Sequence, residues 1–430
     1  MTRVGIAVLL TAGIAWAQEM PADAQRVLDL ARAKVLHTTR NLPRYTCQET
    51  IQREYLSPVN RNPQIKETCD ASLKVNLVRS STDRIRLEVA ISEGHEIDAW
   101  PGASRFDSEN VDELVTSGPI STGSFGTTLI GIFDNPGAHF EFAGEKTVEG
   151  QRVFRYRYTV PLKASHYQVK LSGGMWWNTP YSGDFEISAD AADLARLNQS
   201  TGILPVDSRM CRAETGIDYH FEKVGDGGFL IPQQARLRTT HPDGTATLSV
   251  TTFSACHEYM AESTIRFDDG DAPSEEHTRA ASQASTAFAG GFEIVLKLAS
   301  PIDTDTVAAG DAVLATIARP VLSPKSKQVV APAGIRVRGR ILAARHFFSD
   351  DRGFDIALKF DRYELNGVTA PFAAILMMGQ TRIAGAGVSL RPLDWSGDWG
   401  GAMSFHTKSA HIVAPAGTEL RWMTLTPKTK

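Results

Sequence analysis

The chain has 430 residues, of which 42% are hydrophobic and 22% are charged, a composition typical of a soluble globular protein with two or three domains. No segment after the N-terminal one is apolar for long enough to cross a bilayer as a helix, which argues against an integral membrane protein. The formal net charge of −4 lacks the basic excess of a sequence-independent nucleic-acid binder, so we expect no nucleic acid among the partners.

Residues 1–17 have the pattern of a secretory signal peptide. Arg3 is the only charge there, Val4–Ile14 is a short apolar run, and Ala15-Trp16-Ala17 places small residues around a cleavage site. We expect cleavage after Ala17, and no cysteine follows that could carry a lipid anchor. The mature protein is therefore predicted to be periplasmic or secreted.

The four cysteines are Cys47, Cys69, Cys211 and Cys256, and an even number in an exported chain indicates disulfide bonds. We expect the pairs Cys47–Cys69 and Cys211–Cys256, because each pair falls on neighbouring predicted strands. Free thiols are the alternative. A zinc site with four cysteine ligands is disfavoured, because no two cysteines have the close spacing of a zinc knuckle.

A helix followed by strands is predicted next. Asp23 is the expected N-cap of the helix, and Asn41-Leu42-Pro43 ends it. Its apolar residues recur at helical spacing: Ala24, Val27, Leu28, Ala31 and Val35. The period then changes to two, which indicates half-buried antiparallel strands. The alternating sets are Tyr45, Cys47, Ile51 and Tyr55; Leu73, Val75 and Leu77; Ile85, Leu87, Val89 and Ile91; and Phe154, Tyr156, Tyr158 and Val160.

Two stretches interrupt this strand pattern. Asp112–Val115 is expected to form a helical turn, and Ser124–Phe133 a short buried helix with Ser124 as its cap. Residues 18–267 are therefore predicted to form an α+β, half-barrel-like domain, in which a large antiparallel sheet surrounds a few helices.

The remaining chain is predicted to be a linker and a second domain. Residues 268–290 begin acidic and become rich in Ala and Ser, which is typical of a flexible linker. The three aspartates in Asp268–Asp271 lack the ligand spacing of an EF-hand calcium loop, so a solvated linker is preferred. Short alternating strands with Gly and Pro between them predict an all-β barrel or sandwich over residues 291–430. Its clearest alternating sets are Ile294, Leu296 and Leu298, and Phe354, Ile356, Leu358 and Phe360.

Several short segments of the first domain resemble an uncharacterised family of exported bacterial proteins. They are Leu42–Cys47 (LPRYTC), Thr50–Arg53 (TIQR), Phe253–Tyr259 (FSACHEY) and Ser263–Phe267 (STIRF). That family has no assigned activity, so the resemblance implies no chemistry. The helix followed by a large sheet is also similar in pattern to the LolA/LolB-like half-barrel of lipoprotein carriers, a likeness of fold that implies no function by itself.

Three segments of the second domain resemble the β-barrel domain of the conjugation protein family TrbI. They are Ala309–Val313 (AGDAV), Ala331–Arg340 (APAGIRVRGR) and Phe360-Asp361. Such barrels assemble in the cell envelope in conjugation and type IV secretion systems, so the resemblance implies a barrel that holds other envelope components. This chain departs from that family in having a cleavable signal in place of an inner-membrane anchor, and no Pro-rich arm.

The sequence offers no coherent catalytic, cofactor or metal site. Thr122–Gly126 (TGSFG) has Thr where a nucleophile elbow needs Gly. The histidines form no His-Glu-x-x-His motif, and His406 and His411 are expected on opposite faces of a strand. Gly385-Ala386-Gly387 lacks the third glycine of a dinucleotide-binding loop. We therefore expect no enzyme activity, no cofactor and no metal.

Two groups of residues are candidates for binding: Arg336, Arg338 and Arg340, and Trp176, Trp177, Trp395 and Trp399. The arginines lie on one face of a predicted strand, either as a solvated outer face or as a basic stripe for an anionic lipid or glycan. The tryptophans lie in loops, either as lids over the ends of a sheet or as platforms on which sugars stack.

These observations predict an exported, non-enzymatic envelope protein that binds or scaffolds an envelope protein, glycan or lipid. One alternative is an exported hydrolase of glycan or ester bonds, which requires carboxylates near the tryptophan loops to converge in one cleft. The carboxylates available are Asp184, Glu186, Asp394 and Asp398. The other alternative is a lipid or lipoprotein carrier, which requires an open apolar concavity under the first sheet.

Overall fold

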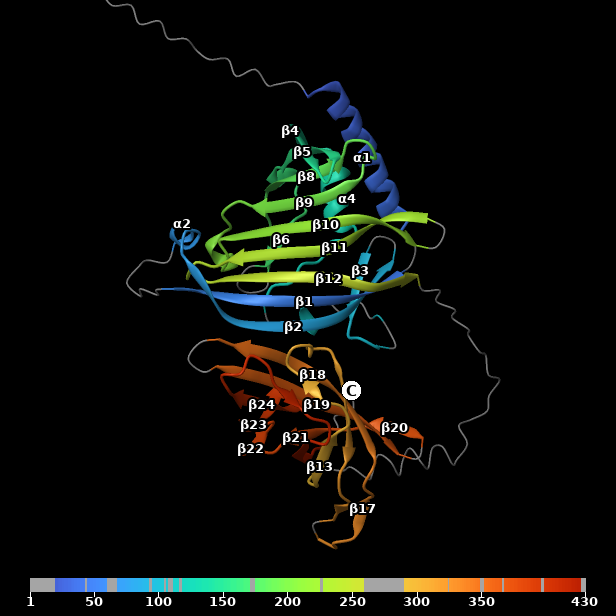
Figure 1. Ribbon diagram of the computed structural model, residues 1–430, viewed down its shortest axis with the longest axis vertical. Coiled ribbons are helices and arrows are strands. Elements are labelled where there is room, and N and C mark those ends of the chain that lie inside the picture. Colours follow the sequence, from blue (N-terminus) through green and yellow to red (C-terminus); the bar gives the residue numbers. More distant parts are fainter. Residues whose placement is uncertain are drawn as a thin grey trace, which may run out of the picture.

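The computed structural model describes residues 20–42, 45–59, 68–92, 95–103, 106, 111–115, 118–170, 175–224, 227–258, 290–323, 325–348, 352–365, 367–395 and 398–426. They form an N-terminal region (20–258) and a smaller C-terminal region (290–426), which follow one another along the long axis of the molecule (Figure 1). The first is a large antiparallel sheet with a few helices and the second is all-β, which confirms the predicted fold class. The predicted signal peptide, and the predicted linker apart from Gly290, lie outside the described residues.

One antiparallel sheet forms the frame of the N-terminal region. In hydrogen-bonded order its strands are β3 (His95–Ala99), β2 (Leu77–Ser92), β1 (Tyr45–Pro58), β12 (Ala246–Glu258), β11 (Gly227–Thr240), β10 (Arg212–Val224), β9 (Leu194–Thr201), β8 (Tyr181–Ser188), β5 (Gln151–Val160) and β4 (His139–Val148). The predicted alternation places one face inside, since the apolar sets of β2 and β5 are buried. Two short strands, β6 (Gln168–Lys170) and β7 (Trp176–Asn178), form a separate ribbon.

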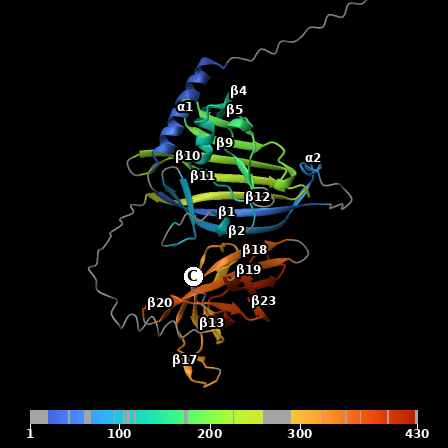
Figure 2. The same ribbon diagram turned by 180° about the vertical axis from the view of Figure 1, so that it is seen from behind.

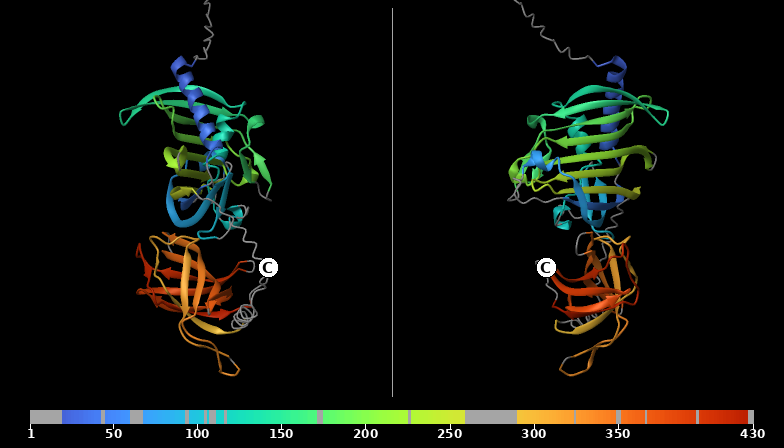
Figure 3. Two further views of the ribbon diagram at one scale, coloured as in Figure 1. Left: turned by 90° about the vertical axis from the view of Figure 1, so that its right-hand side faces the viewer. Right: turned by 60° about the vertical axis from the view of Figure 1, so that its left-hand side comes forward.

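Helices fill the concave side of this curved sheet (Figure 3). α1 (Ala22–Arg40) contacts α4 (Thr127–Phe133), β11 and β8, and its predicted apolar face is buried. Aromatic side chains of β5 and β8 pack against the helices. Tyr156 stacks on Phe185 with ring centroids 5.2 Å apart, and its hydroxyl donates to the carbonyl of Ala24 at 2.8 Å. The concavity is therefore largely occupied by the protein's own side chains.

The two predicted helix caps are wrong. α1 begins at Ala22, because the carbonyl of Pro21 already accepts the first helical hydrogen bond, so Asp23 lies within the first turn. α4 begins at Thr127 with Gly126 before it, and Ser124 is buried and does not cap the helix. None of the helices in the described chain is long and apolar enough to span a bilayer.

Several short helical turns connect the longer elements of the N-terminal region. α3 (Val111–Leu114) confirms the expected helical turn, and two further turns are three-ten helices, η1 (Leu162–Ala164) and η2 (Val206–Ser208). The expected strand at Leu73–Leu77 is wrong, because α2 (Cys69–Ser72) and a turn precede β2, and Val75 is 38% exposed.

The C-terminal region is a single curled antiparallel sheet with two short side ribbons. Its hydrogen-bonded order is β22 (Gly379–Ile383), β23 (Ala386–Trp395), β24 (Asp398–His406), β19 (Gly353–Leu365), β18 (Arg336–Phe347), β15 (Ala312–Ile317), β13 (Glu293–Leu298), β26 (Glu419–Thr424) and β21 (Ala374–Leu376). β20 (Val368–Pro371) pairs with the end of β19. The side ribbons are β14 (Ile302–Asp303) with β25 (Val413–Ala414), and β16 (Val321–Leu322) with β17 (Val329–Ala331). Over the described residues no ladder joins β21 back to β22–β24, so the sheet does not close.

The two regions are joined by backbone pairing. β18 pairs antiparallel with the edge of β2, with Arg345 opposite Asp83 and Phe347 opposite Ser81. The two strands lie side by side in both the front and the back view (Figures 1 and 2). A second contact lies further along β2, where the N–H of Ala309 donates to the carbonyl of Arg84 at 2.8 Å. The two sheets are therefore hydrogen-bonded into one.

Two disulfides are present, as predicted, but their pairing differs from the expected one. Cys47 is bonded to Cys256 and Cys69 to Cys211. β1 pairs with β12 from Tyr45 to Leu56, and the irregularity between Thr46 and Gln48 places Cys47 beside Cys256, at a sequence separation of 209. Cys69 lies on α2, outside the sheet, and its bond to Cys211 ties α2 to the residue directly before β10. Sequential pairing was wrong because strand neighbours in this sheet are distant in sequence.

Candidate functional site

A half-open pocket of about 500 Å³ lies beside the helices on the concave side of the N-terminal sheet. Its walls come from β3, α4 and the segment that enters β6, and its floor includes Gln199 of β9. Tyr167 and Tyr181 line one side, with ring centroids 5.7 Å apart. Glu96 and Asp98 line another, so we name this cavity the acidic pocket.

The register of three strands brings the carboxyl groups together. Glu49 of β1 is opposite Leu87 of β2, and Asp98 of β3 is opposite Val89, two residues further along β2. Alternate residues of a strand share a face, so both side chains point to the inside of the sheet. Glu49 is only 5% exposed, and it is hydrogen-bonded to Asp98.

Glu96 also organises the chain that leads into α4. Its Oε2 accepts the N–H of Gly123 at 2.6 Å, and its Oε1 accepts the N–H of Phe125 at 2.7 Å. One carboxylate thus satisfies two backbone donors immediately before the helix. Glu96 therefore fixes the position of one pocket wall while part of its side chain faces the pocket.

Burial changes the acidity of all three groups. It raises the pKa of Glu96 to about 7, and the two backbone donors offset only part of this effect. It raises the pKa of Asp98 to about 6, against the lowering effect of the hydrogen bond from Glu49. It raises the pKa of Glu49 above its ordinary value, further increased by the charge of Asp98. Near neutral pH the cluster can therefore hold protons as well as accept hydrogen bonds.

The acidic pocket was missed in the sequence, although a signal was present. Glu49 and Arg53 share the register of Tyr45, Cys47 and Ile51, the set that predicted the inner face of β1. Charged residues at inward positions of a strand are unusual and must be paired or protonated. The sequence could not show which partners they meet, because those partners come from other strands.

The predicted tryptophans of the first region lie in the β6–β7 ribbon. Trp176 is 55% exposed and Trp177 50% exposed, so neither is a buried lid. The Nζ atom of Lys170 lies 5.4 Å from the ring centroid of Trp176. The side chains of Trp395 and Trp399 lie outside the described part of the molecule, and their role stays a prediction.

The predicted arginine stripe is divided. Arg336 and Arg338 are exposed, and Arg338 lies 3.7 Å from Glu364. A bulge follows Arg338, and Arg340 is half-buried at the junction, where it donates to the carbonyl of Gly310 at 2.8 Å and faces the ring of Trp100. The three residues therefore do not form one continuous surface.

The carboxylates of the hydrolase alternative do not converge. Asp184 and Glu186 lie on the outer face of β8, where Asp184 accepts from Arg155 at 3.1 Å and Glu186 from Lys146 at 2.7 Å. Asp394 lies on β23 in the other region, and the side chain of Asp398 is outside the described residues. A hydrolase built on these four residues is therefore not supported.

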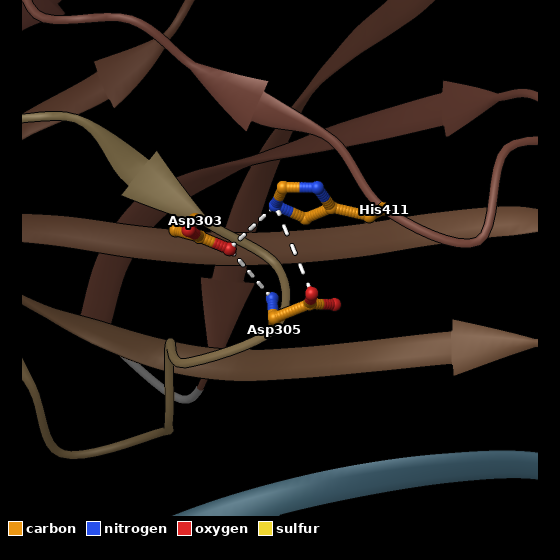
Figure 4. A group of neighbouring side chains, drawn as sticks. All are labelled: Asp303, Asp305 and His411. Carbon is orange, nitrogen blue, oxygen red and sulfur yellow. Dashed lines mark hydrogen bonds and ion pairs between the residues drawn. The ribbon is translucent and has the colours of Figure 1, made fainter.

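One small cluster of potential metal ligands lies on the surface of the C-terminal region (Figure 4). His411 Nε2 lies 2.9 Å from Asp303 Oδ1 and 3.9 Å from Asp305 Oδ2. Asp303 also accepts the N–H of Asp305 at 2.8 Å. His411 lies beyond the end of β24, so it and His406 do not lie on opposite faces of one strand as expected. The two hydrogen bonds to Asp303, from the His411 side chain and from the Asp305 backbone, account for the closeness of the three residues.

No family model and no curated protein matches this chain. Its N-terminal region is similar to two solved structures, each covering 55% of this chain and 94% of the other: a LolA superfamily protein from Nitrosomonas europaea (10% identity, TM-score 0.26) and a putative outer membrane lipoprotein-sorting protein domain from Vibrio parahaemolyticus (11%, 0.26). A third is the Mycobacterium tuberculosis lipoprotein LppX (11% identity, TM-score 0.19, 55% of this chain and 97% of that one). The superfamily name agrees with the predicted resemblance of the first domain, and the resemblance of the second domain to TrbI stays a prediction. TM-scores this low support no conclusion about function.

Proposed function

We propose that this is an exported, non-enzymatic binding protein of the cell envelope, and that it binds its ligand in the acidic pocket. The observation that carries the proposal is a cluster of three carboxyl groups: Glu96 and Asp98 line a half-open cavity of about 500 Å³, and Glu49 is hydrogen-bonded to Asp98. Buried carboxyl groups with raised pKa values are costly to fold, and they are concentrated where a protein binds or reacts. The two disulfides suit a protein that matures in an oxidising compartment.

The chemistry of the walls favours a polar ligand that carries an amine or several hydroxyl groups. Carboxylates accept N–H and O–H hydrogen bonds, and a protonated amine would replace the protons that the cluster otherwise holds. Tyr167 and Tyr181 add aromatic faces beside these acceptors. Amino sugars and ethanolamine head groups are envelope components of this class.

Carriage of a lipid or lipoprotein is the second candidate, and the packing of the concave side weighs against it. A carrier needs room for acyl chains, and that space is taken by α1, α4 and aromatic side chains such as Tyr156 and Phe185. Acyl chains could enter only if α1 or α4 moved away from the sheet.

Calorimetry on a chain that starts at Gln18 tests the proposal, with glucosamine, N-acetylglucosamine and ethanolamine as probes. We expect at least one amine probe to bind, and Asp98→Asn to weaken its binding by about tenfold or more, because a charge-assisted hydrogen bond is lost. Asp184→Asn, a matched change on the outer face, should leave binding unchanged. Absence of binding by all probes, or equal effects of the two variants, would contradict the proposal. If the wild type hydrolyses a glycoside or ester and Asp98→Asn abolishes this activity, the proposal that the protein is non-enzymatic is wrong.

A further inference from the structure

The geometry points to a membrane-docking element: we propose that the β6–β7 ribbon binds the surface of an anionic phospholipid bilayer. This proposal is independent of what the acidic pocket binds, because it rests on the exposed side chains of the ribbon and of the turn before it.

Large apolar side chains of the ribbon and of the segments directly before its two strands are exposed. Met175 is 67% exposed, Trp176 55%, Trp177 50%, and Leu162 of η1 49%. Single exposed apolar residues are common on protein surfaces, but several on one short segment indicate an interaction surface. Tryptophan in particular favours the boundary between water and hydrocarbon, because its ring is apolar and its N–H is polar.

The charges around these side chains favour a negative surface. From residue 161 to residue 183 the sequence contains no Asp or Glu, although acidic residues outnumber basic ones, 49 to 45, in the whole chain. The same segment contains Lys163, His166 and Lys170, all exposed. An apolar patch with basic residues beside it is the composition that binds anionic lipid head groups. An apolar patch alone would fit a protein partner equally well, so the charge pattern decides between them.

The ribbon is held firmly at its base. The hydroxyl of Ser165 donates to the carbonyl of Thr179 at 2.6 Å, and the N–H of Thr179 donates to the carbonyl of Tyr167 at 2.9 Å. Val169, the partner of Trp177 in the ladder, is buried. The exposed tryptophans are therefore presented by an ordered support, and less conformational entropy is lost on docking.

The ribbon also adjoins the acidic pocket. His166, Tyr167 and Gln168 at its base line the cavity, while Trp176 and Trp177 lie across the ladder from Lys170 and Val169. Docking through the ribbon would hold the pocket close to the bilayer surface.

Vesicle co-sedimentation tests the inference, with the chain starting at Gln18 so that the apolar N-terminal segment cannot contribute. We expect binding to vesicles that contain phosphatidylglycerol, weakening with salt because the attraction is electrostatic, and much weaker binding to pure phosphatidylcholine. The double variant Trp176→Ala/Trp177→Ala should lower binding by about tenfold or more. Lys163→Glu/Lys170→Glu should remove the preference for phosphatidylglycerol.

The matched control removes two exposed apolar side chains from a different ribbon, as Leu322→Ala/Val329→Ala, which are 47% and 62% exposed in the wild type. It should bind vesicles like the wild type. All four apolar side chains replaced in the two ribbons are between 47% and 62% exposed, and thermal unfolding confirms that each variant folds. No binding to either vesicle, equal binding to both, or a loss in the control but not in the tryptophan variant would overturn the inference.

Discussion

Asp83 on β2 and Arg345 on β18 are direct partners in the antiparallel ladder that joins the two regions, with Arg345 Nη2 3.7 Å from Asp83 Oδ2. The same carboxylate accepts two hydrogen bonds from Arg53 of β1, both 2.7 Å, and one from the hydroxyl of Tyr55 at 3.0 Å. Asp83 therefore binds side chains on the inner face of the N-terminal sheet and also contacts Arg345 at the junction between the two regions.

Replacing Asp83 should be strongly destabilising. The side chains of Arg53 and Asp83 are 3% and 10% exposed, so Asp83→Asn removes a buried negative charge that is paired with the guanidinium of Arg53. We expect the free energy of unfolding to fall by about 3–5 kcal/mol, measured by urea denaturation. Glu293→Gln, which removes the exposed partner of Arg421, should cost less than about 1 kcal/mol. Similar losses in both variants would show that the buried pair has no special role.

Gly310 should be specifically required at the junction. Its φ is +102°, and a Cβ there would lie 2.2 Å from the carbonyl oxygen of Arg86 and 2.9 Å from the ring of Trp100. Gly334, with φ +89°, has open space around the same position. Both alanine variants carry backbone strain of about 1 kcal/mol or more, but only Gly310→Ala forces β2 and the C-terminal region apart. We expect faster proteolysis between the regions in Gly310→Ala than in Gly334→Ala, and equal rates would argue against the close approach.

The disulfide pairing gives a direct chemical prediction. Peptide mapping under non-reducing conditions should recover Cys47 linked to Cys256 and Cys69 linked to Cys211. Cys69→Ser/Cys211→Ser should lower stability by about 2–5 kcal/mol, because a long loop of the unfolded chain is released. Recovery of Cys47 linked to Cys69 would contradict the strand order, since β1 would then not lie against β12 at that point.

Stability should depend on pH through the acidic pocket. The pKa of Asp98 is raised from its ordinary value of 3.8 to about 6, so between these values the folded protein binds more protons than the unfolded chain. The contribution of Asp98 to the free energy of unfolding must then fall as pH rises through this window and level off above it. The difference in free energy of unfolding between Asp98→Asn and the wild type should shift in favour of the variant by about 1–3 kcal/mol from about pH 4 to about pH 7, measured by urea denaturation. The free energy of unfolding of Asp184→Asn should depend on pH as in the wild type. If both variants show the pH dependence of the wild type, the prediction is wrong.

Local patterns in the sequence predicted the elements well and their assembly poorly. The apolar faces of α1, β2 and β5 are buried as their periods of 3.6 and two required, since amphipathic elements must cover one face. The pairs Cys47–Cys256 and Cys69–Cys211 were not predictable, because they depend on which distant strands become neighbours. Alternation at Leu73–Leu77 failed because α2, which is tied to Cys211 by Cys69, ends at Ser72 and a turn follows it before β2 begins at Leu77.

The candidate site shows the same limit. Trp176 and Trp177 were recognised from residue type alone, and the structure adds that they are exposed on a supported ribbon. Glu49 and Asp98 come from strands that are both neighbours of β2 but lie almost fifty residues apart in sequence, so no local spacing could connect them. A binding surface made by one segment is readable from sequence, whereas a pocket made by several strands is not.

The position of β18 against β2 also bears on how the molecule avoids self-association. An uncovered edge strand presents free N–H and C=O groups that can pair with another copy, the usual first step towards aggregation. On β2 that edge is occupied by β3 over Glu88–Ser92 and by β18 over Ser81–Asp83, with Ala309 bridging the residues between. The C-terminal region thus covers part of the edge of the larger sheet. The N-terminal region made without it would expose unpaired backbone groups of β2 that can pair with another copy.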